Sequence, residues 1–66
     1  MYAAAKIEEW IREGGLKKGF FAQRIGVSKS TLSLILRKGY VPSMPVRIAI
    51  EHETDGHVSR EGWDNE

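Results

Sequence analysis

The sequence contains no cysteine, and this absence excludes disulfide bonds and thiolate zinc sites as supports for the fold. Its two histidines, His52 and His57, have no second pair of ligands nearby, so we expect no metal site. No apolar run approaches the roughly 20 residues that cross a bilayer, and the first residues lack the pattern of a secretory signal. We therefore expect a cytoplasmic protein that does not contact membranes.

Acidic residues are missing from the middle of the chain. Between Gly14 and Ile50 lie seven basic residues and no Asp or Glu, whereas the two ends hold nine acids against three basic residues. The middle thus carries +7 and the ends 3 − 9 = −6, which restores the net charge of +1. Because clustered lysine and arginine attract phosphate and release its counterions, the pattern favours a polyanionic partner. A surface that is basic by chance is the alternative.

Catalytic patterns are missing as well. Glu8 and Glu9 do not form a catalytic pair, because neighbours on a helix point apart by about 100°. We find no nucleophile beside a base and no glycine-rich phosphate loop, so we expect no enzyme activity, no cofactor and no small-molecule ligand. A chain of 66 residues makes one domain, 1–66, and buries only about 60% of its unfolded surface. Dimerisation is the remaining way to add buried area.

Four segments have the apolar periodicity of amphipathic helices. They cover residues 3–13, 17–25, 28–38 and 43–54. Ser28 and Ser43 are suited to cap the third and fourth segments, because a serine hydroxyl accepts from the free amides of a first turn. Trp10 is expected in the core, and residues 57–66 are expected to form a flexible or dimer-forming tail. The predicted fold class is all-α, a bundle of four to five short helices.

Residues 18–37 have the spacing of a helix-turn-helix unit, in which two short helices cross around a tight turn. Ala22 is the small residue needed where the helices pass closest, and Gly26 is the turn glycine needed for a positive φ. Phe20 and Phe21 cannot both face the same way. We expect Phe21 to occupy the buried position and Phe20 to pack under the first helix or the tail. Apolar residues occupy the positions that lock the two helices together: Phe21, Ile25, Val27, Leu32 and Ile35.

The stretch from Phe21 to Ser33 resembles the helix-turn-helix of the lambda-repressor-like domains, in particular the Cro-type regulators of bacteriophages and the YdaS-like antitoxin regulators. Segments 39–42, 48–51 and 54–56 are similar to the segments after the motif in the second group, so the resemblance covers about residues 15–60. It departs at Gly19, where many relatives carry a polar side chain that contacts phosphate, and at Gly62, where an apolar residue is more usual. The resemblance implies an operator in double-stranded DNA as the partner, in a bacterial host cell.

The resemblance also implies that helix 28–38 lies in the major groove, while helix 18–25 crosses the DNA backbone. Carried over by position, the base contacts fall on Ser28, Lys29, Ser30, Ser33 and Leu34. The helical wheel independently selects Ser30, Ser33, Leu34 and Arg37 as the side opposite the apolar stripe. Lysine donates to guanine O6 and N7, and a serine hydroxyl serves any base. Leu34 either meets a thymine methyl or is a half-buried leucine at the junction with the fourth helix.

Five further polar residues are assigned to phosphates, which set the register on DNA without reading its sequence. They are Lys17, Lys18, Gln23, Arg37 and Lys38. The first-turn amides of helix 18–25 add a partial positive charge for one phosphate. Arg24 and Arg47 either join this group or are ordinary solvated arginines.

A second apolar stripe on the fourth helix is the best candidate for a homodimer surface. It consists of Met44 and Ile48, with Val58 and Trp63 as possible additions; alternatively, the last ten residues fold back and cover it. Dimeric readers match two-fold operators, so we expect a phage-type repressor that binds a pseudo-palindromic operator as a dimer, at least on DNA. The second hypothesis is a protein-interaction module such as an antitoxin, whose acidic tail covers a basic partner.

Overall fold

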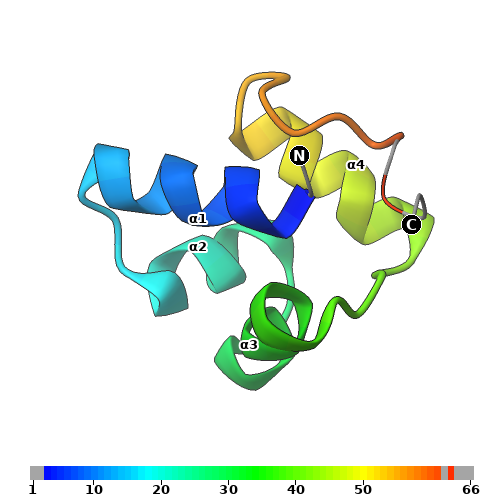
Figure 1. The fold of residues 1–66 in the computed structure, drawn as a ribbon, viewed down its shortest axis with the longest axis horizontal. Helices are drawn as coiled ribbons and strands as arrows, with labels where there is room; N and C mark the ends of the chain where they lie inside the picture. Colours follow the sequence, from blue (N-terminus) through cyan, green and yellow to red (C-terminus); the bar gives the residue numbers. More distant parts are fainter. Residues whose placement is uncertain (1–2, 62, 64–66) are drawn as a thin grey trace.

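The computed structural model describes residues 3–61 and residue 63, and these contain four α-helices and no strand (Figure 1). The helices are α1 (Ala3–Gly14), α2 (Lys18–Ile25), α3 (Lys29–Lys38) and α4 (Met44–Glu53). The all-α class is therefore confirmed, and each helix begins and ends within about one residue of its predicted position once the capping residues are set aside.

The helix ends follow from local chemistry. α2 ends at Gly26, whose φ of 83° is the left-handed conformation that glycine adopts without steric penalty. The amide of Val27 then donates to the carbonyl of Ala22 at 3.0 Å. Two residues later Ser28 caps α3, because its Oγ accepts from the amide of Thr31 at 3.1 Å. The short turn between α2 and α3 is thus fixed by one glycine and one serine.

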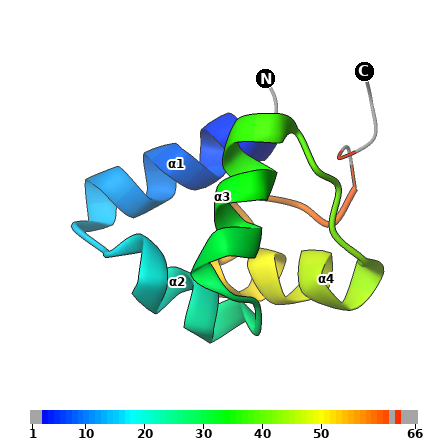
Figure 2. The ribbon, with the colours of Figure 1, turned by 90° about the horizontal axis from the view of Figure 1, so that it is seen from below.

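The four helices enclose one core. α3 packs against both α1 and α2, and α2 also packs against α4. Figures 1 and 2 show α3 on one side of the molecule and the segment after α4, drawn in orange, on the other side. The buried apolar residues come from every helix and from the tail: Ile7, Ile11, Phe21, Ala22, Ile25, Leu32, Ile35, Ile50, Val58 and Trp63.

The segment after α4 folds back onto this core. Thr54 is fully buried, and its Oγ1 donates to the carbonyl of Ile50 at 2.8 Å while accepting from the amide of Val58 at 3.1 Å. Val58 is 1% exposed and Trp63 is 9% exposed, and the Trp63 indole donates to the carbonyl of Ser59 at 3.0 Å. The prediction that Val58 and Trp63 contribute to a dimer surface is therefore wrong, because both side chains complete the core of a single chain.

Two aromatic residues lie elsewhere than predicted. Phe20 does not pack under α1 or the tail; its side chain is 51% exposed, and the guanidinium of Arg24 lies over its ring at 5.9 Å from the centroid. Trp10 is only partly buried, at the edge of the core. Phe21 occupies the buried position of the Phe20–Phe21 pair, as predicted.

Neither a membrane span nor a metal cluster is found within the described ranges 3–61 and 63. None of the helices there is both long and apolar enough to cross a bilayer. No group of three or more His, Asp or Glu side chains lies close enough together there to hold a metal ion.

Candidate nucleic-acid interface

α3 presents one face to the core and the other to solvent. Leu32 and Ile35 are fully buried on the inner side. The opposite side, called here the outward face of α3, consists of Lys29, Ser30, Ser33, Leu34, Arg37 and Lys38. All of these are exposed except Ser33, which is half-buried. The structure therefore brings six of the predicted DNA-contacting residues onto a single helix.

The sequence left two interpretations of Leu34, a contact with a thymine methyl or a half-buried leucine at the junction with the fourth helix. The side chain is 47% exposed and is not part of the core. A leucine on an exposed helix face surrounded by basic and hydroxyl side chains has no role in the core of this chain. It is available for apolar contact with a partner.

Ser28 has a different position from the other predicted base contacts. Its Oγ accepts from the amide of Thr31 and donates to the Thr31 hydroxyl at 3.0 Å. Both functions of the hydroxyl are thus used to begin α3. In the free protein Ser28 is a helix cap, and the outward face begins at Lys29.

Lys29 lies against the first turn of α2. A Cβ atom placed on Gly19 would be 3.9 Å from Cδ of Lys29, which is an ordinary van der Waals contact. The absence of a side chain at Gly19 therefore leaves the aliphatic stem of Lys29 as the nearest group. The stem of Lys29 thus passes beside Gly19.

The predicted phosphate contacts on and before α2 are accessible. Lys17 and Gln23 are exposed, and Lys17 precedes α2 in an extended conformation without a side-chain cap. Lys18 is exposed too, with its Nζ 3.9 Å from Oε2 of Glu8 in α1. An ion pair this long between two half-exposed side chains is weak, because water screens it.

Two arginines of the basic block, the stretch between Gly14 and Ile50 that has no acidic residue, form hydrogen bonds within the chain. Nε and Nη2 of Arg24 donate to the two carboxylate oxygens of Glu53 at 3.2 and 3.1 Å, joining α2 to α4. These hydrogen bonds, and the negative charge of Glu53, raise the pKa of Arg24. Nε of Arg47 donates to the carbonyl of Pro42 at 3.0 Å. The structure therefore gives both arginines an intramolecular role.

No family model, curated protein or solved structure matches this chain significantly.

Three large apolar residues that follow α3 in the sequence are exposed. Tyr40, Val41 and Met44 are 51%, 39% and 43% exposed, and we call them the loop patch. The amide of Tyr40 donates to the carbonyl of Leu34 at 3.4 Å, which ties the patch to α3. Ile48, the other half of the predicted dimer stripe, is half-buried.

The exposure of Tyr40 and Val41 was not predicted, because the sequence pattern there indicated only a connection between helices. Two large apolar residues between Gly39 and Pro42, outside any helical period, were the signal that could have identified them.

Proposed function

We propose that the chain is a sequence-specific DNA-binding transcriptional regulator in which α2 and α3 act as a helix-turn-helix unit. One observation carries the proposal. The outward face of α3 presents basic and hydroxyl side chains that make no ion pair or side-chain hydrogen bond within the described part of the chain. It does so in a stretch of sequence without a single acidic residue.

The dimensions of α3 suit the major groove. An α-helix is about 10–12 Å in diameter with its side chains, and the major groove of B-DNA is about 12 Å wide. Lys29 and Ser30, in the first turn, face the base edges, with Ser33 and Leu34 one turn later. Lysine selects guanine, serine serves any base, and leucine suits a thymine methyl.

The phosphate contacts flank this reading surface. Lys17, Lys18 and Gln23 hold one strand near the start of α2, where the free first-turn amides add a partial positive charge. Arg37 and Lys38 hold the backbone at the other end of α3. These contacts fix the orientation of α3 without reading sequence.

The regulator binds a pseudo-palindromic operator as a homodimer. Met44 and Ile48 contribute to the contact between the two copies, and the exposed loop patch supports an apolar contact on this side of the molecule. Two copies then place their α3 helices about one helical turn of DNA (roughly 34 Å) apart. A dimer bound there represses transcription by excluding polymerase, with no cofactor.

Selection of bound sequences from randomised duplexes tests this proposal most directly. We expect an enriched, two-fold symmetric sequence and an affinity that falls steeply with salt. Lys29→Ala and Ser33→Ala should each relax the preference at one base position, while Lys6→Ala on α1 should leave the selected sequence unchanged. If no sequence is enriched, or if Lys29→Ala and Ser33→Ala select the same sequence with the same affinity, the assignment of α3 to the groove is wrong.

A protein-interaction module of the antitoxin type is the second candidate function. The exposed loop patch favours it, because large apolar side chains on a small surface are typical of protein contacts. This function alone predicts no enriched DNA sequence and no steep salt dependence. The same selection, repeated at two salt concentrations, therefore separates the two candidates.

A further inference from the structure

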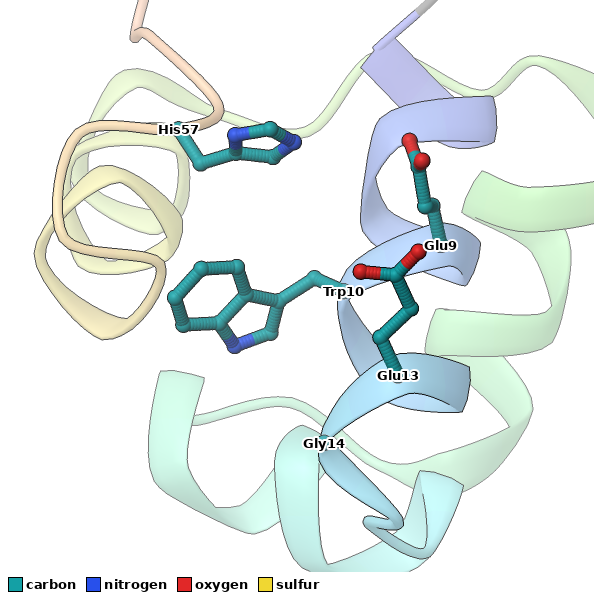
Figure 3. A pocket seen from close by; sticks show the side chains of 5 residues that line it. All are labelled: Glu9, Trp10, Glu13, Gly14 and His57. Atoms are coloured by element: carbon teal, nitrogen blue, oxygen red, sulfur yellow. The ribbon is translucent and has the colours of Figure 1, made fainter.

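A hollow lies between α1 and the segment that follows α4. Figure 3 shows its walls: the indole of Trp10 and the imidazole of His57 face each other, and Glu9 and Glu13 lie beside them. The two ring centroids are 5.7 Å apart, and the ring planes are inclined by 32°. The volume of about 310 Å³ is at the lower end of the range of ligand sites (roughly 300–1,000 Å³). It is sufficient for one side chain or a similarly small group.

The charges around this hollow are unfavourable for the stability of α1 in two ways. Glu9 and Glu13 are four residues apart on α1, where like charges destabilise a helix. Glu13 also lies in the last turn, where the helix dipole disfavours a negative charge. Within residues 3–61 and 63 neither carboxylate forms an ion pair, although Lys6 is only one turn before Glu9. A local arrangement that costs stability without an internal compensation is typical of a binding site.

Trp10 adds an aromatic surface for a cation beside the two carboxylates. The face of an indole ring attracts cations, and a planar guanidinium also stacks on it. In this chain the indole packs against the edge of the core and also lines the hollow. Aromatic walls and two uncompensated carboxylates together select a cation with an apolar stem.

We infer that this hollow binds a basic side chain of a protein partner, arginine in preference to lysine. The guanidinium stacks on the Trp10 indole beside His57, and its N–H groups donate to Glu9 and Glu13. Arginine is preferred because its flat, weakly hydrated head suits both the rings and the carboxylates.

This site is separate from the proposed DNA interface. In Figures 1 and 2 the segment after α4 and α3 lie on opposite sides of the core. The chain therefore holds a partner protein on one side while α3 contacts DNA on the other, and the inference does not depend on DNA binding.

The test is a titration of the ¹⁵N-labelled full chain with a blocked Gly-Arg-Gly peptide, followed by NMR. The chain has two indole N–H signals, and Trp10→Phe identifies which belongs to Trp10. We expect saturable shifts of the Trp10 indole signal, with a dissociation constant in the millimolar range, and little change at the buried Trp63. The same peptide with citrulline, the neutral counterpart of arginine, should produce no saturable shift.

Matched variants locate the site. Glu13→Gln should weaken binding about fivefold, the effect of removing one charge near the guest in water. Glu61→Gln makes the same charge change on an exposed residue outside the hollow and should leave binding unchanged. Lys29→Ala should also bind the peptide normally, which separates this result from any failure of DNA binding.

Three outcomes would overturn the inference. The first is equal shifts with the citrulline peptide, which would remove the role of charge. The second is equal weakening by Glu13→Gln and Glu61→Gln, which would indicate a general effect of net charge. The third is the absence of any saturable shift at Trp10.

Discussion

α3 and α4 are helices of equal length, ten residues each, yet they use their polar side chains in different ways. Around α4, Arg47 bonds to the backbone, Glu51 pairs with Arg60 at 2.8 Å, and Glu53 pairs with Arg24. On the outward face of α3 no such internal bond is found in the described residues. The polar groups of α4 link it to the rest of the fold, whereas those on the outward face of α3 make no such bond in the described residues. Substitutions should therefore separate stability from binding.

The largest effect is expected at Thr54, just after α4. Thr54→Val keeps the shape of the side chain but removes the hydroxyl that donates to Ile50 and accepts from Val58. The buried amide of Val58 is then unsatisfied, and the free energy of unfolding should fall by about 2–3 kcal/mol. Urea unfolding followed by circular dichroism measures this. Thr54→Ser is the matched control, because it retains the hydroxyl; an equal loss in both variants would contradict the hydrogen-bond explanation.

On α3 the corresponding effect is on binding. Lys29→Ala should reduce affinity for the selected operator by on the order of 1–3 kcal/mol. Its unfolding free energy should stay within about 0.5 kcal/mol of the original, because an exposed side chain without internal partners is removed. Fluorescence anisotropy on labelled duplexes and urea unfolding give the two values. A large loss of stability with unchanged affinity would reverse the roles assigned to α3 and α4.

Two arginines of the basic block provide a sharper comparison. Arg37→Ala should weaken binding to all DNA sequences alike and reduce the slope of log affinity against log salt by about 0.9. Arg24→Ala should leave that slope unchanged and slightly lower the melting temperature, because it breaks the link to Glu53. Binding isotherms at several salt concentrations decide between them. Equal slopes for the two variants would show that the internal ion pair does not distinguish the two arginines.

The smallest effect is expected where α2 meets Lys29. Gly19→Ala should raise the free energy of unfolding by about 0.5–1 kcal/mol, because glycine inside a helix is less favourable than alanine. The new Cβ finds ordinary contact with the Lys29 stem and no clash. Thermal melting measures the change. Gly26→Ala is the contrasting variant and should destabilise the chain, because the φ of 83° at Gly26 disfavours any side chain.

Local signals in the sequence were sufficient for most of the fold. Gly26 and Ser28 act within a few residues of themselves, so their roles as helix stop and cap could be predicted. The buried positions of α3 followed from its period, because Leu32 and Ile35 share one face. The period also selected the outward face on which the proposed site lies.

The errors concern contacts between segments that are distant in sequence. Phe20 and Phe21 are adjacent in a helix of eight residues, too short for its period to decide how far each is buried. The link between Arg24 and Glu53 joins residues 29 positions apart, so charge counting could not reveal it. Residues 57–63 have no period at all, and the burial of Val58 and Trp63 depends on the core they meet. Apolar residues in such a segment indicate that they are buried, but they do not indicate whether they are buried in their own chain or against a second copy.

The burial of Trp63 has a consequence for how the protein is made. Ile7 and Ile11 are synthesised before the other buried residues of this core, and Trp63 is synthesised after them. The buried residues of all four helices are therefore synthesised before Trp63. Until Trp63 packs onto them, the helices leave apolar surface exposed, and such surface makes a folding chain prone to aggregation. Completion of the core therefore waits for the segment after α4.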